Sequence, residues 1–596
     1  MSSLDNKRRN FLKALGIGTL SMAFSKRIFS GTRKKPFKRP NVILIITDDQ
    51  GYGDFSCHGN PVLKTPHLDR LYSQSVRLTN FHVDPTCAPT RSSLLTGRYS
   101  SRTGVWHTIM GRSLLRKDET TLADIFSYHG YQTGIFGKWH LGDNFPYRPQ
   151  DRGFKESVVI GGGAIGNTPD YWGNDYFDDT YTHNSRLEKY KGYCTDVFFD
   201  EALKFIRKNR HHPFFCYLST NTPHYPHNVS EKYSQPYQGK VPDIRATFYG
   251  MISNIDENMG VLIKELKSLR LEENTILVFL TDNGTSFGVD LDRQGFPVDG
   301  FNAGMRGKKG SIYEGGHRVP CFIRWPGSGI EGGRDIRQLS AHIDILPTLL
   351  DLCEISMPSS IQIDGNSLKP LLEGKESPWM NRVLLVHNQR VDLPIKGRRY
   401  NVMTDQWRLL NGTELYDIQK DPGQRQNIAS RYPDKVHELK RFYEVWWDDI
   451  SKRFDEYTYI LLGRNKNNPV KLASHDLHGQ VGWDQVHVRR NSPCHGYWAV
   501  EFARDGLYEV SVRRWPREAR LALEEAPPEA EVFKPTQARL KVADVDESKK
   551  IPKGVEEVNF RVPLKAGKTR LQAWLIDGRE NGLVNTAFYV YVTLIK

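Results

Sequence analysis

Three unbroken apolar runs mark the first half of the chain. They cover residues 41–46, 214–218 and 275–280. Runs of this kind, rich in β-branched and aromatic residues, are typical of strands that are buried on both faces, as in a parallel sheet. Helical periodicity covers residues 122–129, 195–207 and 248–269. This alternation of strands and helices predicts an α/β fold, in which a sheet carries helices on both of its faces.

The pattern changes twice in the second half of the chain. Short strands are expected over residues 383–386, 400–403 and 407–410, with a helix over about 434–452. We interpret residues 376–455 as a smaller antiparallel subdomain. Beyond residue 460, apolar and polar residues alternate in segments that are separated by Gly, Asp and Pro: 496–502, 506–512, 558–562 and 587–592. This alternation predicts an appended β-sandwich over residues 460–596, which either contacts carbohydrate or serves as a packing module.

The N-terminus is typical of an export signal. Arg8 and Arg9 precede a short apolar run over residues 14–24. A twin arginine before a weakly hydrophobic stretch resembles a bacterial Tat signal, so residues 1–30 are expected to direct export. A general secretory signal and an uncleaved anchor are the alternatives. Because the run is too short to span a bilayer, we expect a periplasmic or secreted protein with no stable membrane insertion after signal removal.

Charge and cysteine content exclude several classes of protein. The formal net charge is +14, and part of this excess lies in residues 7–38, at the export signal and its flank. The remainder can attract an anionic partner. The sequence contains no nucleic-acid-binding motif, so DNA and RNA are not expected partners. Seven cysteines without a Cys-x-x-Cys spacing exclude a disulfide scaffold and a zinc-finger type of site.

Acidic and amide side chains follow two of the predicted strands. Asp48 and Asp49 follow the first apolar run, and Asp282 and Asn283 follow the run over 275–280. In α/β sheets, ligands bind at the carboxyl ends of strands. Three carboxylates and one amide oxygen suit Ca²⁺ or Mg²⁺ rather than zinc. For either pair alone, a turn or a helix cap is the alternative interpretation.

Five segments, in chain order, together resemble the type I, formylglycine-dependent sulfatases. They are residues 41–54, 87–98 (CAPTRSSLLTGR), 130–140 (GYQTGIFGKWH), 222–226 (TPHYP) and 306–316 (RGKKGSIYEGG). The similarity spans about residues 40–450 and leaves the C-terminal quarter outside it. The resemblance implies an alkaline-phosphatase-like fold, with a large mixed sheet flanked by helices in a catalytic domain over residues 40–375. A smaller antiparallel subdomain is expected to follow.

The resemblance also implies a nucleophile that is made from Cys87. In this family a maturation enzyme oxidises the cysteine to formylglycine (3-oxoalanine), and the hydrate of the aldehyde attacks the sulfur of a sulfate ester. Arg91 is expected to fix the modified side chain, and Asp282 is the expected base for the hydrate. The expected ligands of one Ca²⁺, which polarises the sulfate oxygens, are Asp48, Asp49, Asp282, Asn283 and the modified Cys87.

The remaining motif residues are expected around the sulfate group. By resemblance, Lys138 and Lys309 neutralise charge that develops on the sulfuryl oxygens. His224 protonates the leaving alcohol oxygen. His140 bonds the second hydroxyl of the hydrate and later helps to expel sulfate. Five other histidines are candidates for the substrate mouth or for ordinary loop positions: His107, His183, His211, His212 and His227.

Taken together, the sequence predicts an exported bacterial sulfatase that acts on a sulfated oligosaccharide or polysaccharide. A phosphonate monoester or phosphodiester hydrolase of the same superfamily is the first alternative, because such relatives share the fold and the modified cysteine. A non-catalytic carbohydrate-binding protein is the second. Rates on aryl sulfates and aryl phosphate diesters separate the first alternative from the prediction, and glycan binding without sulfate release would favour the second.

Overall fold

The first apolar run forms the central strand β1 (Asn41–Thr47), whose seven residues are all buried. Its side chains alternate between two cores: Val42, Leu44 and Ile46 pack on one face of the sheet, and Ile43 and Ile45 pack on the other. Strands β8 (Phe214–Ser219) and β9 (Thr275–Thr281) pair with β1 in parallel, one on each side. The three predicted strands therefore form the centre of one sheet.

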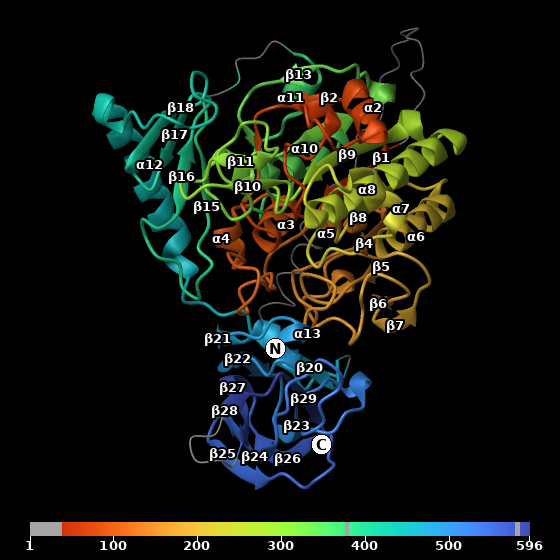
Figure 1. The fold of residues 1–596 in the computed structure, drawn as a ribbon, viewed down its shortest axis with the longest axis vertical. Helices are drawn as coiled ribbons and strands as arrows, with labels where there is room; N and C mark the ends of the chain where they lie inside the picture. Colours follow the sequence, from red (N-terminus) through yellow and green to blue (C-terminus); the bar gives the residue numbers. More distant parts are fainter. Residues whose placement is uncertain (1–38, 376–378, 380, 466, 578–583) are drawn as a thin grey trace, which may run out of the picture. The chain divides into compact units, whose positions relative to one another are not determined.

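In the described part of this computed structural model the sheet has ten strands and is mixed. Figure 1 labels its central strands β9, β1, β8 and β4. The central strands run parallel, whereas β12 pairs antiparallel with both β9 and β2, and β6 pairs antiparallel with β5 and β7. The strand order is β13 (Asp335–Ile336), β2 (Val76–Leu78), β12 (Cys321–Arg324), β9, β1, β8, β4 (Gln132–Gly137), β5 (Glu156–Val159), β6 (Thr180–His183) and β7 (Arg186–Lys189). The predicted α/β class with a large mixed sheet is confirmed.

Helices cover both faces of the ten-stranded sheet. The core that contains Val42 includes residues of α3 (Cys87–Thr96), α5 (Leu122–Tyr128) and α10 (Ile345–Leu352). The core that contains Ile43 includes residues of α2 (Pro66–Gln74), α6 (Cys194–Asn209) and α8 (Asp243–Ser268). The predicted helices over 122–129, 195–207 and 248–269 correspond to α5, α6 and α8. Helix α8 begins at Asp243, directly after Pro242, which takes the N-cap position.

A four-stranded antiparallel sheet follows in the chain. It consists of β15 (Leu384–His387), β16 (Tyr400–Met403), β17 (Trp407–Leu410) and β18 (Glu414–Asp417), in this order. Helix α12 (Pro433–Ile450) packs on it through Tyr443, whose ring stacks on Tyr400 with centroids 3.7 Å apart. The predicted strands and helix of this region are all present.

Beyond residue 459 the chain forms two further sheets around one core. The larger follows the order β19 (Ile460–Leu462), β22 (His495–Phe502), β27 (Gly567–Asp577), β24 (Pro535–Val542) and β25 (Val545–Lys550), with β21 (His478–Gln480) and β28 (Val584–Thr586) paired to it. The smaller follows the order β20 (Val470–Ala473), β29 (Tyr589–Leu594), β23 (Gly506–Arg513) and β26 (Val558–Leu564). Trp498 and Val500 of the larger sheet share a core with Val510 and Val590 of the smaller, an arrangement typical of a β-sandwich.

The structure describes residues 39–375, 379, 381–465, 467–577 and 584–596. The expected export signal over residues 1–30 lies outside these ranges. Within them, no helix combines the length and the apolar character that crossing a membrane requires. All seven cysteines lie in the described ranges and are free thiols.

Candidate active site

The acidic residues that were predicted to meet at a sheet edge do so. Thr47 at the end of β1 is in register with Thr281 at the end of β9, so the residues that follow the two strands emerge side by side. The backbone N–H of Asp49 donates to Oδ1 of Asp282 over 3.0 Å. Asp49 has a positive φ of 68°, a conformation that is uncommon outside turns and functional sites.

Cys87 occupies the first turn of α3, and every residue of this helix is buried. Its Sγ and one carboxylate oxygen each of Asp48 and Asp282 all lie within 4.8 Å of one another. Burial raises the pKa of the Cys87 thiol, and Lys138 and Lys309 lower it by less. The unmodified side chain is therefore a protonated thiol near neutral pH, which is a weak nucleophile.

The donor set around Cys87 fits a hard divalent cation. Oδ1 of Asp48 and Oδ1 of Asn283 are buried and accept no hydrogen bond from any described residue. Burial and the neighbouring Asp48 carboxylate raise the pKa of Asp282 to about 7. This raised pKa reflects the free-energy cost of ionising the buried carboxylates together. A cation among these oxygens would lower that cost, and the two oxygens without a hydrogen bond could serve as its ligands. Carboxylate and amide oxygens are the ligands that Ca²⁺ and Mg²⁺ prefer.

Arg91 binds the buried carboxylates of this group. Its side chain is fully buried, and its Nη2 lies 2.9 Å from Oδ2 of Asp282 and 3.9 Å from Oδ1 of Asp48. Its Nη1 donates to the hydroxyl of Ser219 at the end of β8. Burial lowers the pKa of Arg91, but the charges of Asp282 and Asp48 raise it more, so the guanidinium stays charged and fixes the orientation of Asp282.

Two lysines reach the same carboxylates from other elements. Lys138 follows β4, and its Nζ lies 2.7 Å from Oδ2 of Asp48. The preceding Gly137 has a φ of 112°, and a Cβ there would stand 1.9 Å from the carbonyl oxygen of Ser219. Only glycine therefore allows the end of β4 to lie this close to the end of β8. Lys309 Nζ lies 2.6 Å from Oδ1 of Asp49. The adjacent Lys308 instead donates to the carbonyl of Val289 over 3.3 Å.

His224 and His140 complete the predicted set. His224 Nε2 lies 3.8 Å from Oδ2 of Asp49, and burial together with the charge of Lys309 lowers the pKa of His224 to about 3. His140 is buried, and its Nε2 bonds the carbonyl oxygen of Thr108 over 2.8 Å. Its Nδ1 is buried without a hydrogen-bond partner among the described residues, so this ring nitrogen is available to a ligand.

The structure adds a histidine that the sequence did not reveal. His475 follows β20 in the C-terminal region, and its ring centroid lies 5.9 Å from that of His140. Its Nδ1 bonds Asp476 over 2.9 Å, whereas its Nε2 is buried without a partner among the described residues. No motif surrounds His475, and more than 300 residues separate it from His140, so only the fold could bring the two together.

The five other candidate histidines separate into three groups. His107 is buried beside His475. The ring of His227 packs edge-on against Phe287 and lies near Asp49 and His224. His183 is in β6 and pairs with Glu188 over 2.9 Å. His211 and His212 are exposed between α6 and the start of β8. These positions precede β8, whereas the site lies beyond the carboxyl ends of the strands, so for these two the structure favours the alternative of ordinary loop positions.

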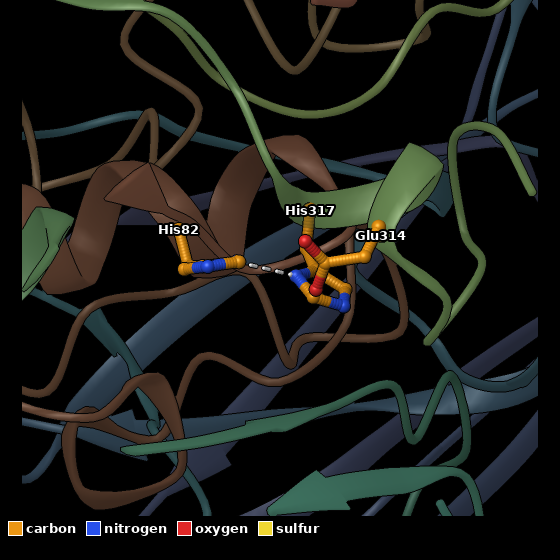
Figure 2. A group of neighbouring side chains, drawn as sticks. All are labelled: His82, Glu314 and His317. Atoms are coloured by element: carbon orange, nitrogen blue, oxygen red, sulfur yellow. Dashed lines mark hydrogen bonds between the residues drawn. The ribbon is translucent and has the colours of Figure 1, made fainter. Parts of the chain in front are cut away.

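A second buried group with metal-like composition lies outside this site. His82 of β3 (Phe81–His82) and Glu314 and His317 of α9 (Glu314–His317) point toward one another, and the two imidazoles share a hydrogen bond (Figure 2). Their Nδ1 atoms are 3.0 Å apart. Arg408 pairs with Glu314 over 2.7 Å, and neither side chain is exposed. Because a guanidinium already compensates the Glu314 charge, we assign this group a structural role beneath the segment that carries Lys309.

Family comparison agrees with this geometry. The sulfatase family model matches residues 40–355, and the model of the C-terminal region of N-sulphoglucosamine sulphohydrolase matches residues 307–443. Human N-acetylgalactosamine-6-sulfatase is 31% identical over 360 residues, which are 56% of this chain and 66% of the human protein. An ulvan-active sulfatase of Formosa agariphila is 31% identical over 477 residues, which are 72% of this chain and 86% of that protein.

Solved structures share the fold. The crystal structure of Ps i-CgsB has a TM-score of 0.62 at 27% identity and covers 71% of this chain and 96% of its own. The same protein in complex with k-i-k-neocarrahexaose matches equally well. A phosphonate monoester hydrolase of Agrobacterium radiobacter has a TM-score of 0.51 at 21% identity, and it covers 68% of this chain and 96% of its own. That last likeness concerns the fold alone.

Proposed function

The chain belongs to the sulfatase family, and we propose that it is a sulfuric ester hydrolase that removes sulfate from a sulfated carbohydrate. One observation carries this proposal: Cys87 Sγ lies within a buried group with Asp48 and Asp282. Lys138 brings positive charge to Asp48, and Lys309 brings it to the neighbouring Asp49. This arrangement suits an anionic ester whose charge must be neutralised as the bond to sulfur breaks.

Relatives supply the support for a carbohydrate substrate. Two of them are named for N-acetylgalactosamine-6-sulfate and ulvan activity, and Ps i-CgsB was crystallised with a neocarrahexaose. The chain spans about two thirds of the human relative's length. We therefore assign the proposed activity to the described catalytic region. We further propose the division into residues 40–375, 376–455 and 460–596, and export to the periplasm or beyond by the Tat-like signal.

Two groups complete the proposed site. A maturation enzyme would oxidise Cys87 to formylglycine, and the hydrate of this aldehyde supplies an oxygen nucleophile that the protonated thiol does not. Ca²⁺ supplies positive charge that polarises the sulfate oxygens. The residues proposed to hold it are Asp48, Asp49, Asp282 and Asn283, together with the modified residue 87.

The chain's own side chains then have distinct tasks. Asp282 accepts the proton of the attacking hydroxyl, and Arg91 keeps that carboxylate in place through its 2.9 Å contact. Lys138 and Lys309 turn from the aspartates toward the sulfuryl oxygens as negative charge develops there. His140 exchanges protons with the modified residue 87, for which its unpartnered Nδ1 is available.

His224 is proposed to donate a proton to the leaving alcohol oxygen. At rest its imidazole is neutral, because burial and Lys309 lower its pKa to about 3. A bound sulfate ester brings negative charge next to the ring and raises that pKa, which favours the imidazolium. Proton donation is thereby linked to the presence of substrate, and it leaves the alcohol neutral as the bond to sulfur breaks.

The proposal is tested with protein co-expressed with a formylglycine-generating enzyme. Sulfate release from 4-nitrophenyl sulfate and from sulfated oligosaccharides is measured for the wild type and for Cys87→Ala, beside hydrolysis of bis(4-nitrophenyl) phosphate. The proposal expects sulfate release that Cys87→Ala abolishes and that exceeds phosphodiester hydrolysis. Faster hydrolysis of the phosphodiester would favour the phosphoesterase alternative. Glycan binding without any ester hydrolysis would favour a binding protein.

A further inference from the structure

The outer face of the larger C-terminal sheet carries a groove that the proposed chemistry does not use. Along β22, Trp498 and Val500 point into the sandwich core, so the alternate residues Tyr497 and Ala499 face outward. Arg570 of β27 lies opposite Ala499 in the register of the sheet. The small Ala499 side chain lets the surface sink between its larger neighbours.

We name this hollow the tyrosine–cation groove. Its volume is about 520 Å³, which is in the range of small-molecule sites. Thr569 and Gln572 add a hydroxyl and an amide to the lining. The residues that define the groove are Tyr457, Tyr459, Tyr497, Lys541, Lys568 and Arg570.

The three cations of the groove are exposed and have no carboxylate partner among the described residues. This contrasts with the surrounding surface, where Arg539 pairs with Asp546 over 2.7 Å. Glu501 stands opposite Lys568 in register but lies 3.5 Å from Lys117 instead. Asp546 stands opposite Lys541 in register, but its ion pair is with Arg539. Lys541, Lys568 and Arg570 thus concentrate positive charge without ion pairs of their own in one hollow, which suits an anionic ligand.

The tyrosines line the groove beside these charges, and contacts with neighbouring side chains fix their positions. The hydroxyls of Tyr457 and Tyr497 are 3.0 Å apart, and His478 stacks on Tyr497 with ring centroids 5.4 Å apart. Arg570 lies 4.4 Å from the Tyr497 ring centroid, and Lys568 lies 4.8 Å from that of Tyr459. A cation lies over each of the three rings, so what the tyrosines offer a sugar is their hydroxyls, which can donate and accept hydrogen bonds.

The groove connects by direct contacts to the candidate active site. Arg112 lies 4.5 Å from the ring centroid of Tyr457. Two residues earlier in the chain, the N–H of Met110 donates to the carbonyl of His475, the histidine that packs beside His140. The carbonyl of Thr108 in the same segment bonds His140 Nε2 over 2.8 Å. One short segment therefore borders both sites.

We propose that the tyrosine–cation groove binds a stretch of a sulfated polysaccharide chain away from the sulfate that is removed. This inference rests on the proposed sulfatase function for the identity of its ligand. Ammonium and guanidinium groups bind the sulfates of neighbouring units, and tyrosine hydroxyls form hydrogen bonds with the hydroxyls of the sugars. The accessory sandwich then holds a polymeric substrate near the catalytic residues, whereas a small aryl sulfate gains nothing from it.

The test compares two triple variants of the full chain. One replaces Lys541, Lys568 and Arg570 by alanine. The matched control replaces Lys534, Lys550 and Lys553, which are also exposed on the sandwich but do not line the groove. Both remove three positive charges. Retardation in gels that contain ulvan, carrageenan or chondroitin sulfate, or their desulfated forms, measures binding, and 4-nitrophenyl sulfate hydrolysis measures the active site.

The proposal expects the wild type to be retarded by at least one sulfated polymer and not by its desulfated form. The groove variant should lose about tenfold or more of that affinity, because it lacks three charge-assisted contacts, while the control variant and all aryl sulfate rates stay near wild type. Three results would overturn the proposal. The first is an equal loss of polymer affinity in both variants, and the second is retardation of the wild type by none of the polymers. The third is groove-dependent binding of single-stranded DNA that is as strong as that of the sulfated polymer. Groove-dependent glycan binding without aryl sulfatase activity would retain the groove and reject the proposed function.

Discussion

Lys138 donates a hydrogen bond from Nζ to Oδ2 of Asp48 over 2.7 Å, and neither side chain is exposed. A basic residue expected at the sulfate and an acidic residue expected at the metal are therefore direct partners in the protein interior. Around them, three carboxylates face three basic side chains: Asp48, Asp49 and Asp282 against Arg91, Lys138 and Lys309. A bound divalent cation would make this group net positive, which would favour the binding of an anionic sulfate ester.

Replacing Lys309 by alanine tests the role of the second lysine. We expect kcat/KM for 4-nitrophenyl sulfate to fall about 100-fold or more, because a charge aimed at the transition state is lost from a buried site. Lys308→Ala is the matched control, since Lys308 contacts the Val289 carbonyl instead of the carboxylates, and its rate should stay within about threefold of wild type. A larger loss in Lys308→Ala than in Lys309→Ala would reverse the assignment.

Asn283→Ala tests the proposed cation site without changing its charge. The variant lacks an amide oxygen that is buried and without a hydrogen-bond partner among the described residues. We expect one Ca²⁺ per wild-type chain by isothermal titration calorimetry and an affinity about tenfold weaker or worse in the variant. Calcium should raise the melting temperature of the wild type more than that of Asn283→Ala. An equal rise in both proteins would contradict the assigned ligand.

Glu314→Gln tests whether His82, Glu314 and His317 form a structural group or a metal site. Arg408 would be left buried without its 2.7 Å carboxylate partner, which costs about 3–5 kcal/mol for a buried pair. We therefore expect a lower melting temperature and an unchanged calcium stoichiometry. A variant that melts with the wild type but loses bound metal would show that His82, Glu314 and His317 form a metal site after all.

Asp54 predicts a pH dependence of stability. Its side chain is buried, and burial raises its pKa to about 7 although hydrogen bonds from Thr285 and Gly51 lower it. Below about pH 4 the carboxyl is neutral in the folded and the unfolded chain. As the pH rises, the unfolded chain ionises first, so the free energy of unfolding falls until the folded carboxyl ionises near pH 7, by about 4 kcal/mol in total.

Asp54→Asn has no such ionisation. The melting temperature of this variant relative to wild type should therefore increase between pH 4 and 7 and stay constant above that range. Calorimetric melting of both proteins across this range provides the measurement. A difference that does not change with pH would mean that Asp54 is ionised in the folded protein throughout.

Several features could be predicted because they depend on short stretches of sequence. The strands β1, β8 and β9 are recognisable as apolar runs, and their parallel pairing determines that Asp49 and Asp282 lie close together. The register of parallel strands explains why residues more than 200 positions apart form one site. The sulfatase motifs identified the family for the same reason, since each motif is continuous in the chain.

Other features depend on tertiary contacts that no local pattern encodes. Strand β4 was not predicted, because Gly134 and Gly137 interrupt its apolar pattern, although five of its six residues are buried. His475 reaches His140 only because the C-terminal region packs beside the 107–112 segment. The tyrosine–cation groove likewise combines side chains from separate strands, and outward-facing Tyr, Lys and Arg residues are ordinary in each strand taken alone.

The central claim is that residue 87 becomes the nucleophile of a sulfatase. The most direct measurement combines peptide mass spectrometry of residue 87 with sulfate release by the same preparation, co-expressed with a formylglycine-generating enzyme. We predict an aldehyde at residue 87 and a rate of sulfate release proportional to the modified fraction, with no release by Cys87→Ala. Sulfate release by protein whose Cys87 is still an unmodified thiol would contradict the account.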